Sequence, residues 1–197
     1  MQQSDAQSEF WFSSARFGDQ VCLLDGSESV SYTDLITRAD AWIQRASMVL
    51  PDGVDRPLVG MEITATVGMI AAYVGCLRAG WPIILLPDGH IASKDPKSIV
   101  GVYQPNLFVA PDPTSSDGTQ TRTGASEPCD MPDDLAVLLS TSGTTGAVKL
   151  VMLSAKNIDA NAKAISDYLA IQTNDVAITT LALHYSYGMS VLNSYWG

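Results

Sequence analysis

Two apolar runs flank the polar stretch Thr141-Ser142-Gly143-Thr144-Thr145-Gly146-Ala147-Val148-Lys149. The run before it is Leu135-Ala136-Val137-Leu138-Leu139, and the run after it is Leu150-Val151-Met152-Leu153. Short apolar runs bounded by turn residues predict two strands joined by a loop. In such a loop glycines let backbone N–H groups approach an anion, hydroxyls add donors, and a lysine adds a full positive charge. The pattern favours a phosphate-binding loop over an ordinary polar turn.

The spacing around the lysine argues against the Walker-type phosphate loop. That motif has Gly directly before its Lys and Ser or Thr directly after it. In this chain Val148 precedes Lys149 and Leu150 follows it. A Walker-type nucleoside triphosphatase is therefore disfavoured.

The stretch instead resembles the signature T-S-G-[ST]-T-G-x-P-K-G of the adenylate-forming superfamily, which includes acyl- and aryl-CoA synthetases, firefly luciferase and the adenylation domains of peptide synthetases. Val148 replaces the usual Pro and Leu150 the usual Gly, which changes the backbone freedom at the loop exit. The resemblance implies that ATP phosphates are held by the matching residues: Thr141, Ser142, Gly143, Thr144, Thr145, Gly146 and Lys149.

Three further segments resemble the same family, in the order expected for it. Residues 21–40 are similar to its opening, and residues 77–87 to its L-x-A-G-x-x-x-x-P segment. His184-Tyr185-Ser186-Tyr187-Gly188 resembles the P-x-x-H-x-x-G segment of CoA ligases. The resemblance implies a catalytic role for His184 beside the carboxylate of an acid substrate.

The sequence indicates different roles for the two histidines. A single His after an apolar run is more often a satisfied core or loop residue, and only the upstream phosphate loop favours the functional role of His184. His90 has no such support and is expected to be a turn residue.

Length and family together suggest how the chain is organised. Its 197 residues can form one domain with a sizeable core. Members of the family are longer, so we expect residues 1–197 to be the N-terminal subdomain of a larger AMP-binding ligase. The later subdomain and the C-terminal domain with its lysine are not in the sequence. The alternative is a naturally short protein.

Composition narrows the classes of partner. Hydrophobic residues make up 46% and charged residues 16%, as in a chain with a packed core. A net charge of −10 argues against a nucleic-acid-binding surface. The N-terminus lacks the pattern of a signal peptide, and no apolar run is long enough to span a membrane, so a cytoplasmic protein is expected. The three cysteines show no paired or zinc-binding spacing, and no metal ligands are predicted.

Strand and helix patterns alternate along the chain. This predicts an α/β fold with a mainly parallel sheet and helices on both faces. Residues 111–134 are rich in Ser, Thr, Gly, Asp and Pro and predict a long surface loop within the domain. The predicted strands are 21–24, 29–32, 58–63, 83–86, 107–110, 135–140, 149–153 and 176–181. The predicted helices are 34–50 with Thr33 as N-cap, 66–79 ended by Gly80, 96–103, 154–169, and one beginning near 187.

The family resemblance implies an ATP-dependent, AMP-forming ligase that joins a small carboxylic acid to a thiol. The acid displaces pyrophosphate from ATP with Mg²⁺ present, and CoA or the phosphopantetheine of an acyl carrier protein then takes the acyl group. Two alternatives stay open. One is a non-catalytic nucleotide- or partner-binding module, and the other is an amino-acid adenylation domain that loads a carrier protein. The 197 residues alone are expected to be inactive as a ligase.

Overall fold

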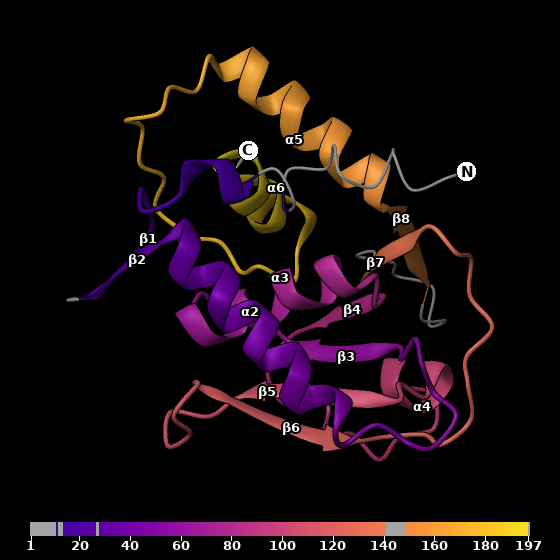
Figure 1. Cartoon of the computed structure of the whole chain (residues 1–197). Coiled ribbons are helices and arrows are strands. Elements are labelled where there is room, and N and C mark those ends of the chain that lie inside the picture. Colours follow the sequence, from indigo (N-terminus) through magenta and orange to yellow (C-terminus); the bar gives the residue numbers. More distant parts are fainter. Residues whose placement is uncertain (1–10, 12–13, 27, 141–148, 197) are drawn as a thin grey trace, which may run out of the picture.

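The computed structural model describes residues 11, 14–26, 28–140 and 149–196. Its centre is a six-stranded sheet with strand order β6-β5-β3-β4-β7-β8 (Figure 1). The strands are β3 (Val59–Glu62), β4 (Ile83–Leu86), β5 (Leu107–Pro111), β6 (Thr119–Thr123), β7 (Leu135–Ser140) and β8 (Leu150–Ser154). The four inner strands are parallel, and β6 and β8 pair antiparallel at the two edges. The prediction of an α/β fold with a mainly parallel sheet is confirmed.

Helices cover both faces of this sheet, as the sequence predicts. One face packs against α2 (Tyr32–Ser47), α3 (Val67–Ala79), α5 (Ala155–Leu169) and α6 (Ser186–Ser194). The other face packs against the short helix α4 (Ile99–Tyr103). Alternating side chains of β4 divide between the two clusters, because neighbouring residues of a strand point to opposite faces.

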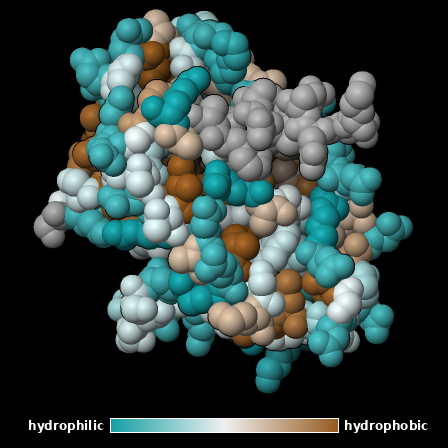
Figure 2. Space-filling view, in the orientation of Figure 1, coloured by the Kyte–Doolittle hydropathy of each residue, from teal (hydrophilic) through white to brown (hydrophobic). Residues whose placement is uncertain are grey.

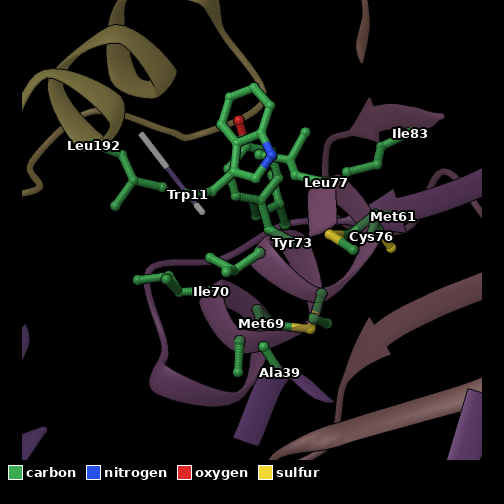
Figure 3. Packing of buried hydrophobic residues seen from close by; sticks show 14 of the residues in the cluster. Trp11, Ala39, Met61, Met69, Ile70, Tyr73, Cys76, Leu77, Ile83 and Leu192 are labelled. Atoms are coloured by element: carbon green, nitrogen blue, oxygen red, sulfur yellow. The ribbon is translucent and has the colours of Figure 1, made fainter. Parts of the chain in front are cut away.

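The larger core is built around α3, ten of whose thirteen residues are buried. Figure 3 shows Ile70, Tyr73 and Leu77 of this helix among side chains from several other elements. Gly80 ends the helix in the left-handed conformation, with φ of 70°, which a glycine adopts without strain. The predicted end of this helix is confirmed. Figure 2 shows, from the same side as Figure 1, that hydrophilic residues cover much of the surface in view and that hydrophobic residues lie in separate spots.

A small hairpin precedes the main sheet, formed by β1 (Val21–Asp25) and β2 (Glu28–Ser31) after the 3-10 turn η2 (Ser14–Phe17). The helix α2 follows directly. Its N-cap is Ser31 and not Thr33 as predicted, because Ser31 and Asp34 form a reciprocal capping box. The helix ends at Ser47, three residues before the predicted end.

Three other segments differ from the sequence prediction. The helix predicted at 96–103 begins only at Ile99, where Ser98 caps it. The predicted loop 111–134 contains the strand β6, which pairs along the whole of β5. Residues 176–181, predicted as a strand, form no strand in the structure. Within the described residues no helix combines the length and apolar character needed to cross a membrane.

Candidate active site

The predicted phosphate loop connects the last residue of β7 to the first residues of β8. Its residues Thr141, Ser142, Gly143, Thr144, Thr145 and Gly146 lie outside the described residues. The strand ends that hold the loop are described: Ser140 pairs with Leu150, so Lys149 lies beside the carboxyl end of β7. Lys149 is exposed. The carboxyl ends of parallel strands are where open α/β sheets bind their ligands, so this position suits a phosphate-binding cation.

The neighbouring strand β4 contributes a second loop at the same edge. Strands β4 and β7 are parallel partners, and the chain leaves β4 at Leu86 to form the turns of residues 87–93. His90 lies in this segment, where its N–H donates to the carbonyl of Pro87 at 3.4 Å. Gly89 has φ of +76°, which makes this first turn easy for glycine and strained for other residues.

His184 stands in the turn that leads into α6. The Tyr185 N–H donates to the Ala182 carbonyl at 3.2 Å, and the Met189 N–H to the Tyr185 carbonyl at 3.1 Å. Gly188 completes this turn, since a Cβ at that position would overlap the Ala182 carbonyl oxygen. The glycine of the predicted motif is thus required for close backbone approach.

Three polar contacts fix α6 to the rest of the molecule. The Tyr73 hydroxyl donates to Asn193 Oδ1 at 3.3 Å, and both residues are buried. The Tyr32 hydroxyl donates to the Trp196 carbonyl at 3.2 Å, and the Ser190 hydroxyl to Asn161 Oδ1 at 3.1 Å. The contacts from α3 and α5 reach α6 itself, and the contact from α2 reaches Trp196 just after it, so the helix that begins two residues after His184 is held from several elements.

His184 is partly buried, and its ring lies 4.2 Å from the ring of Tyr185 between centroids. Burial, and in second place the charge of His90, hold the pKa of His184 below its ordinary value of 6.5. The imidazole is therefore neutral at pH 7, with one nitrogen able to donate a hydrogen bond and the other able to accept one. His90 itself lies in the turn after β4, as the sequence predicts.

The motif spacing adds a second residue that the sequence analysis did not single out as catalytic. Counted back from Gly188, the H-x-x-G pattern reaches Tyr185, and His184 is one residue earlier. Tyr185 is 57% exposed, whereas His184 is turned further inward. Counting from the glycine would have identified this residue from the sequence.

The described residues suit anion and carboxylate recognition better than metal binding. Lys149 supplies positive charge at the carboxyl edge of the sheet, and His184 and Tyr185 supply hydrogen-bonding groups. No group of three or more His, Cys, Asp or Glu side chains is placed to hold a metal ion in the part of the chain that the structure describes.

A family model described as "AMP-binding enzyme" matches residues 88–196. This range contains the predicted phosphate loop and both histidines. Among curated proteins, a sulfoacetate–CoA ligase of Cupriavidus necator is 34% identical over 107 residues, which are 53% of this chain and 21% of the ligase.

Two solved structures share the fold. The apo structure of MatB from Rhodopseudomonas palustris has a TM-score of 0.72 at 20% identity and covers 95% of this chain. The O-succinylbenzoate coenzyme A synthetase MenE from Bacillus subtilis, solved with AMP, has a TM-score of 0.69 at 19% identity and covers 94%. This chain spans only 42% and 52% of those two chains.

Proposed function

Because the chain belongs to the family of AMP-binding enzymes, we propose that it supplies the phosphate loop and part of the acid site of an ATP-dependent ligase. The reaction is the activation of a carboxylic acid as an acyl-adenylate, followed by transfer of the acyl group to a thiol. Two observations support the proposal: the sequence of residues 141–149, and the pairing of Ser140 with Leu150, which puts Lys149 beside the carboxyl end of β7.

In the first step a carboxylate oxygen of the acid attacks the α-phosphorus of ATP, and the bond to the leaving pyrophosphate breaks. Negative charge collects on the leaving β- and γ-phosphates. We assign their binding to Thr141, Ser142, Gly143, Thr144, Thr145, Gly146 and Lys149. A divalent cation such as Mg²⁺ supplies further charge neutralisation when bound. Positioning and electrostatic stabilisation account for most of the catalysis in phosphoryl and nucleotidyl transfer.

His184 is assigned to the carboxylate of the acid. A neutral imidazole can orient a carboxylate by donating one hydrogen bond without adding a charge that would hold the nucleophile too tightly. The lowered pKa of His184 supports this protonation state. His184 lies two residues before α6, which is anchored to the buried Tyr73, and this supports a fixed backbone position for it.

The thiol acceptor is proposed to be CoA. The relative from Cupriavidus necator is named a CoA ligase, and MenE, which shares the fold, is named a coenzyme A synthetase. A carrier-protein phosphopantetheine is the alternative acceptor. Since the chain spans about half of the solved relatives that it matches, we expect residues 1–197 alone to catalyse no adenylation.

The proposal is tested by Lys149→Ala in ATP–pyrophosphate exchange, measured on the longest protein that contains these residues. Losing a charge-assisted contact to phosphate costs about 1.5–3 kcal/mol, so kcat/KM for ATP should fall about 10- to 150-fold while KM for the acid changes little. Lys156→Ala is the control, because it removes the same charge from the start of α5, at the opposite end of β8. Unchanged kinetics in the Lys149 variant would show that the loop is only a turn.

His184 is tested by His184→Ala together with Tyr185→Phe. If His184 faces the acid, its loss lowers acid-dependent exchange and leaves the melting temperature unchanged. A structural histidine behaves in the opposite way, since stranding its hydrogen-bond partner costs about 1–3 kcal/mol of stability. If Tyr185→Phe abolishes exchange and His184→Ala does not, the role belongs to the tyrosine at the motif spacing.

A further inference from the structure

A groove of about 530 Å³ lies near the carboxyl ends of β3 and β5, on the sheet face that also carries α4. This volume is typical of sites for small molecules. Figure 1 shows β5 and β6 together at the edge of the sheet away from β8, so the groove lies apart from the strands that flank the predicted phosphate loop. Its walls include Glu62 at the end of β3, Ile91 in the loop after β4, Phe108 of β5, and Gln120 and Arg122 of β6.

Glu62 brings a buried carboxylate to this groove. The residue is only 7% exposed, and its Oε1 accepts a hydrogen bond from the Ile91 N–H at 2.6 Å. The other oxygen, Oε2, has no hydrogen-bond partner among the residues that the structure describes, and it is not sealed from solvent. Burying a carboxylate is costly unless its oxygens are bonded or paired with a charge. Oε2 is therefore open to a donor or a cation that enters the groove.

Arg122 brings a positive charge to the solvent side of the same groove, since its side chain is exposed. Its guanidinium donates to the Ile91 carbonyl at 3.2 Å and lies 5.1 Å above the centre of the Phe108 ring, within the range of a cation–π contact. A guanidinium has five N–H donors, so donors remain for an anion. The ring and the carbonyl hold the group in place for such a contact.

The two opposite charges of the groove do not pair with each other in the described part of the chain. Glu62 bonds to the N–H of Ile91, and Arg122 bonds to the carbonyl of the same residue. Their bonding atoms are therefore spaced to hold the amino and carbonyl groups of a single residue. A free α-amino acid carries an ammonium and a carboxylate at this same separation.

The rest of the wall is largely apolar and includes Ile91, Phe108 and Ala110. The Phe108 ring is fixed by close backbone neighbours. A Cβ at Gly60 would lie 3.1 Å from this ring, and a Cβ at Gly124 only 2.8 Å from it. A wall that is already in place lowers the cost of ordering on binding, and its character suits a small apolar side chain.

We propose that this groove binds a small zwitterion of the α-amino acid type, with its ammonium on Glu62 Oε2, its carboxylate on Arg122 and its apolar side chain along Phe108. Because Glu62 is buried and Arg122 is exposed, the ammonium lies inside and the carboxylate faces solvent. Neither His184 nor Lys149 lines the groove, so this site is separate from the proposed acid and phosphate sites. Its test needs no ligase activity, and either proposal can fail without the other.

The experiment is an NMR titration of the ¹⁵N-labelled full chain with three matched probes. L-Valine carries both charges, 3-methylbutanoate lacks the ammonium, and L-valinamide lacks the carboxylate. L-Valine should shift the backbone amide of Ile91 and the side-chain amide of Gln120 in a saturable way. Each of the other probes loses one charge-assisted contact and should bind about 10- to 150-fold more weakly.

Two variants assign the two contacts. Glu62→Gln keeps an oxygen acceptor for the Ile91 N–H but removes the charge, so it should weaken L-valine by a similar factor and leave 3-methylbutanoate unchanged. Arg122→Gln should weaken L-valine and leave L-valinamide unchanged. Arg16→Gln is the matched control, because Arg16 is also exposed and lies 4.7 Å above the Phe17 ring, outside the groove. It should change none of the three affinities.

Absence of a saturable shift at Ile91 and Gln120 would overturn the site and leave Glu62 and Arg122 with the task of holding Ile91. Equal affinity for 3-methylbutanoate would overturn the ammonium contact, and equal affinity for L-valinamide would overturn the carboxylate contact. Undiminished binding of L-valine to Arg122→Gln would place the ligand elsewhere. If Glu62→Gln does not fold, the three probes on the wild-type chain and on the exposed Arg122 variant decide the question.

Discussion

Two segments of this molecule adopt the opposite of what their sequences predict. Thr119–Thr123, with the polar sequence Thr-Gln-Thr-Arg-Thr, lies in a predicted loop and forms the edge strand β6. Residues 176–181, Val-Ala-Ile-Thr-Thr-Leu, have the composition of a strand and form none. In Figure 1 the first segment lies along the sheet, and the second lies in the extended trace between α5 and α6. In these two segments, the formation of a strand depends more on a neighbouring strand to pair with than on the apolar character of the sequence.

The polar strand β6 is held by a tight turn and by side-chain contacts to α2. It pairs with β5 over five residue pairs, from Leu107 with Thr123 to Pro111 with Thr119. The Trp42 Nε1–H donates to the Thr119 hydroxyl at 3.2 Å, and the Thr123 hydroxyl donates to the Val49 carbonyl at 2.7 Å. An ion pair between Arg45 and Asp117 joins the turn to the same helix.

The apolar segment has no comparable partner within the described residues. Val176 is 74% and Ile178 is 79% exposed. Other large hydrophobic side chains between residues 151 and 187 are exposed as well: Val151, Met152, Tyr168, Leu169, Leu181, Tyr185 and Tyr187. A strand-forming sequence without an adjacent edge leaves its backbone groups to water, so its propensity is not expressed.

The largest expected effect sets Leu107→Ala against Ile178→Ala. Leu107 is fully buried in β5, so its truncation should lower the free energy of unfolding by about 2–5 kcal/mol. Ile178 is mostly exposed, and its truncation should change that free energy by about 0.5 kcal/mol or less. Urea unfolding of both variants measures the contrast. A large loss from Ile178→Ala would show that residues 176–181 are packed after all.

A smaller effect is expected for Gly68→Ala, which tests the close contact between α3 and the turn before β6. A Cβ at residue 68 would overlap the backbone carbonyl of Asp117. Overpacking of this kind costs about 1–3 kcal/mol, and hydrogen exchange of the β6 amides should accelerate. Gly53→Ala is a useful comparison, since a Cβ there meets open space and only its φ of +79° is unfavourable. Unaltered exchange in β6 would mean that the turn is not held by α3.

The smallest effect concerns Asp117 and pH. Burial by itself would raise the pKa of Asp117, but hydrogen bonds from Ser115, Thr119 and Arg45 outweigh it and lower the pKa below 3.8. A folded-state pKa below the unfolded value stabilises the fold above pH 3.8, and this stabilisation is lost as pH falls through the folded-state pKa. Asp117→Asn should therefore lower the melting temperature at pH 7. The two melting curves should converge on acidification, and a constant difference at all pH values would exclude the ionised carboxylate as the cause.

Much of the sheet could be predicted because its strands carry their own signal. Residues 83–86 form a short apolar run, and all four of these residues are buried. The helix predicted over 66–79 ends before Gly80, because glycine readily adopts the left-handed backbone conformation found there. The cap at Ser31 was missed by two residues, since Ser31 and Thr33 are chemically similar and only the geometry with Asp34 distinguishes them. Strand β6 was missed because its residues are polar, as an edge strand facing solvent permits.

For the candidate site too, some features could be predicted from the sequence and others only from the structure. Sequence alone predicts the kind of chemistry, because glycines, hydroxyls and a lysine at this spacing are typical of a loop that binds phosphate. It also determined the continuous apolar runs, such as residues 83–86, that a parallel sheet buries on both faces. Only the tertiary structure decided that the side chains of Glu62 in β3 and Arg122 in β6 both bond to the backbone of Ile91 after β4. These groups are far apart in sequence and meet through strand order, which no local pattern encodes.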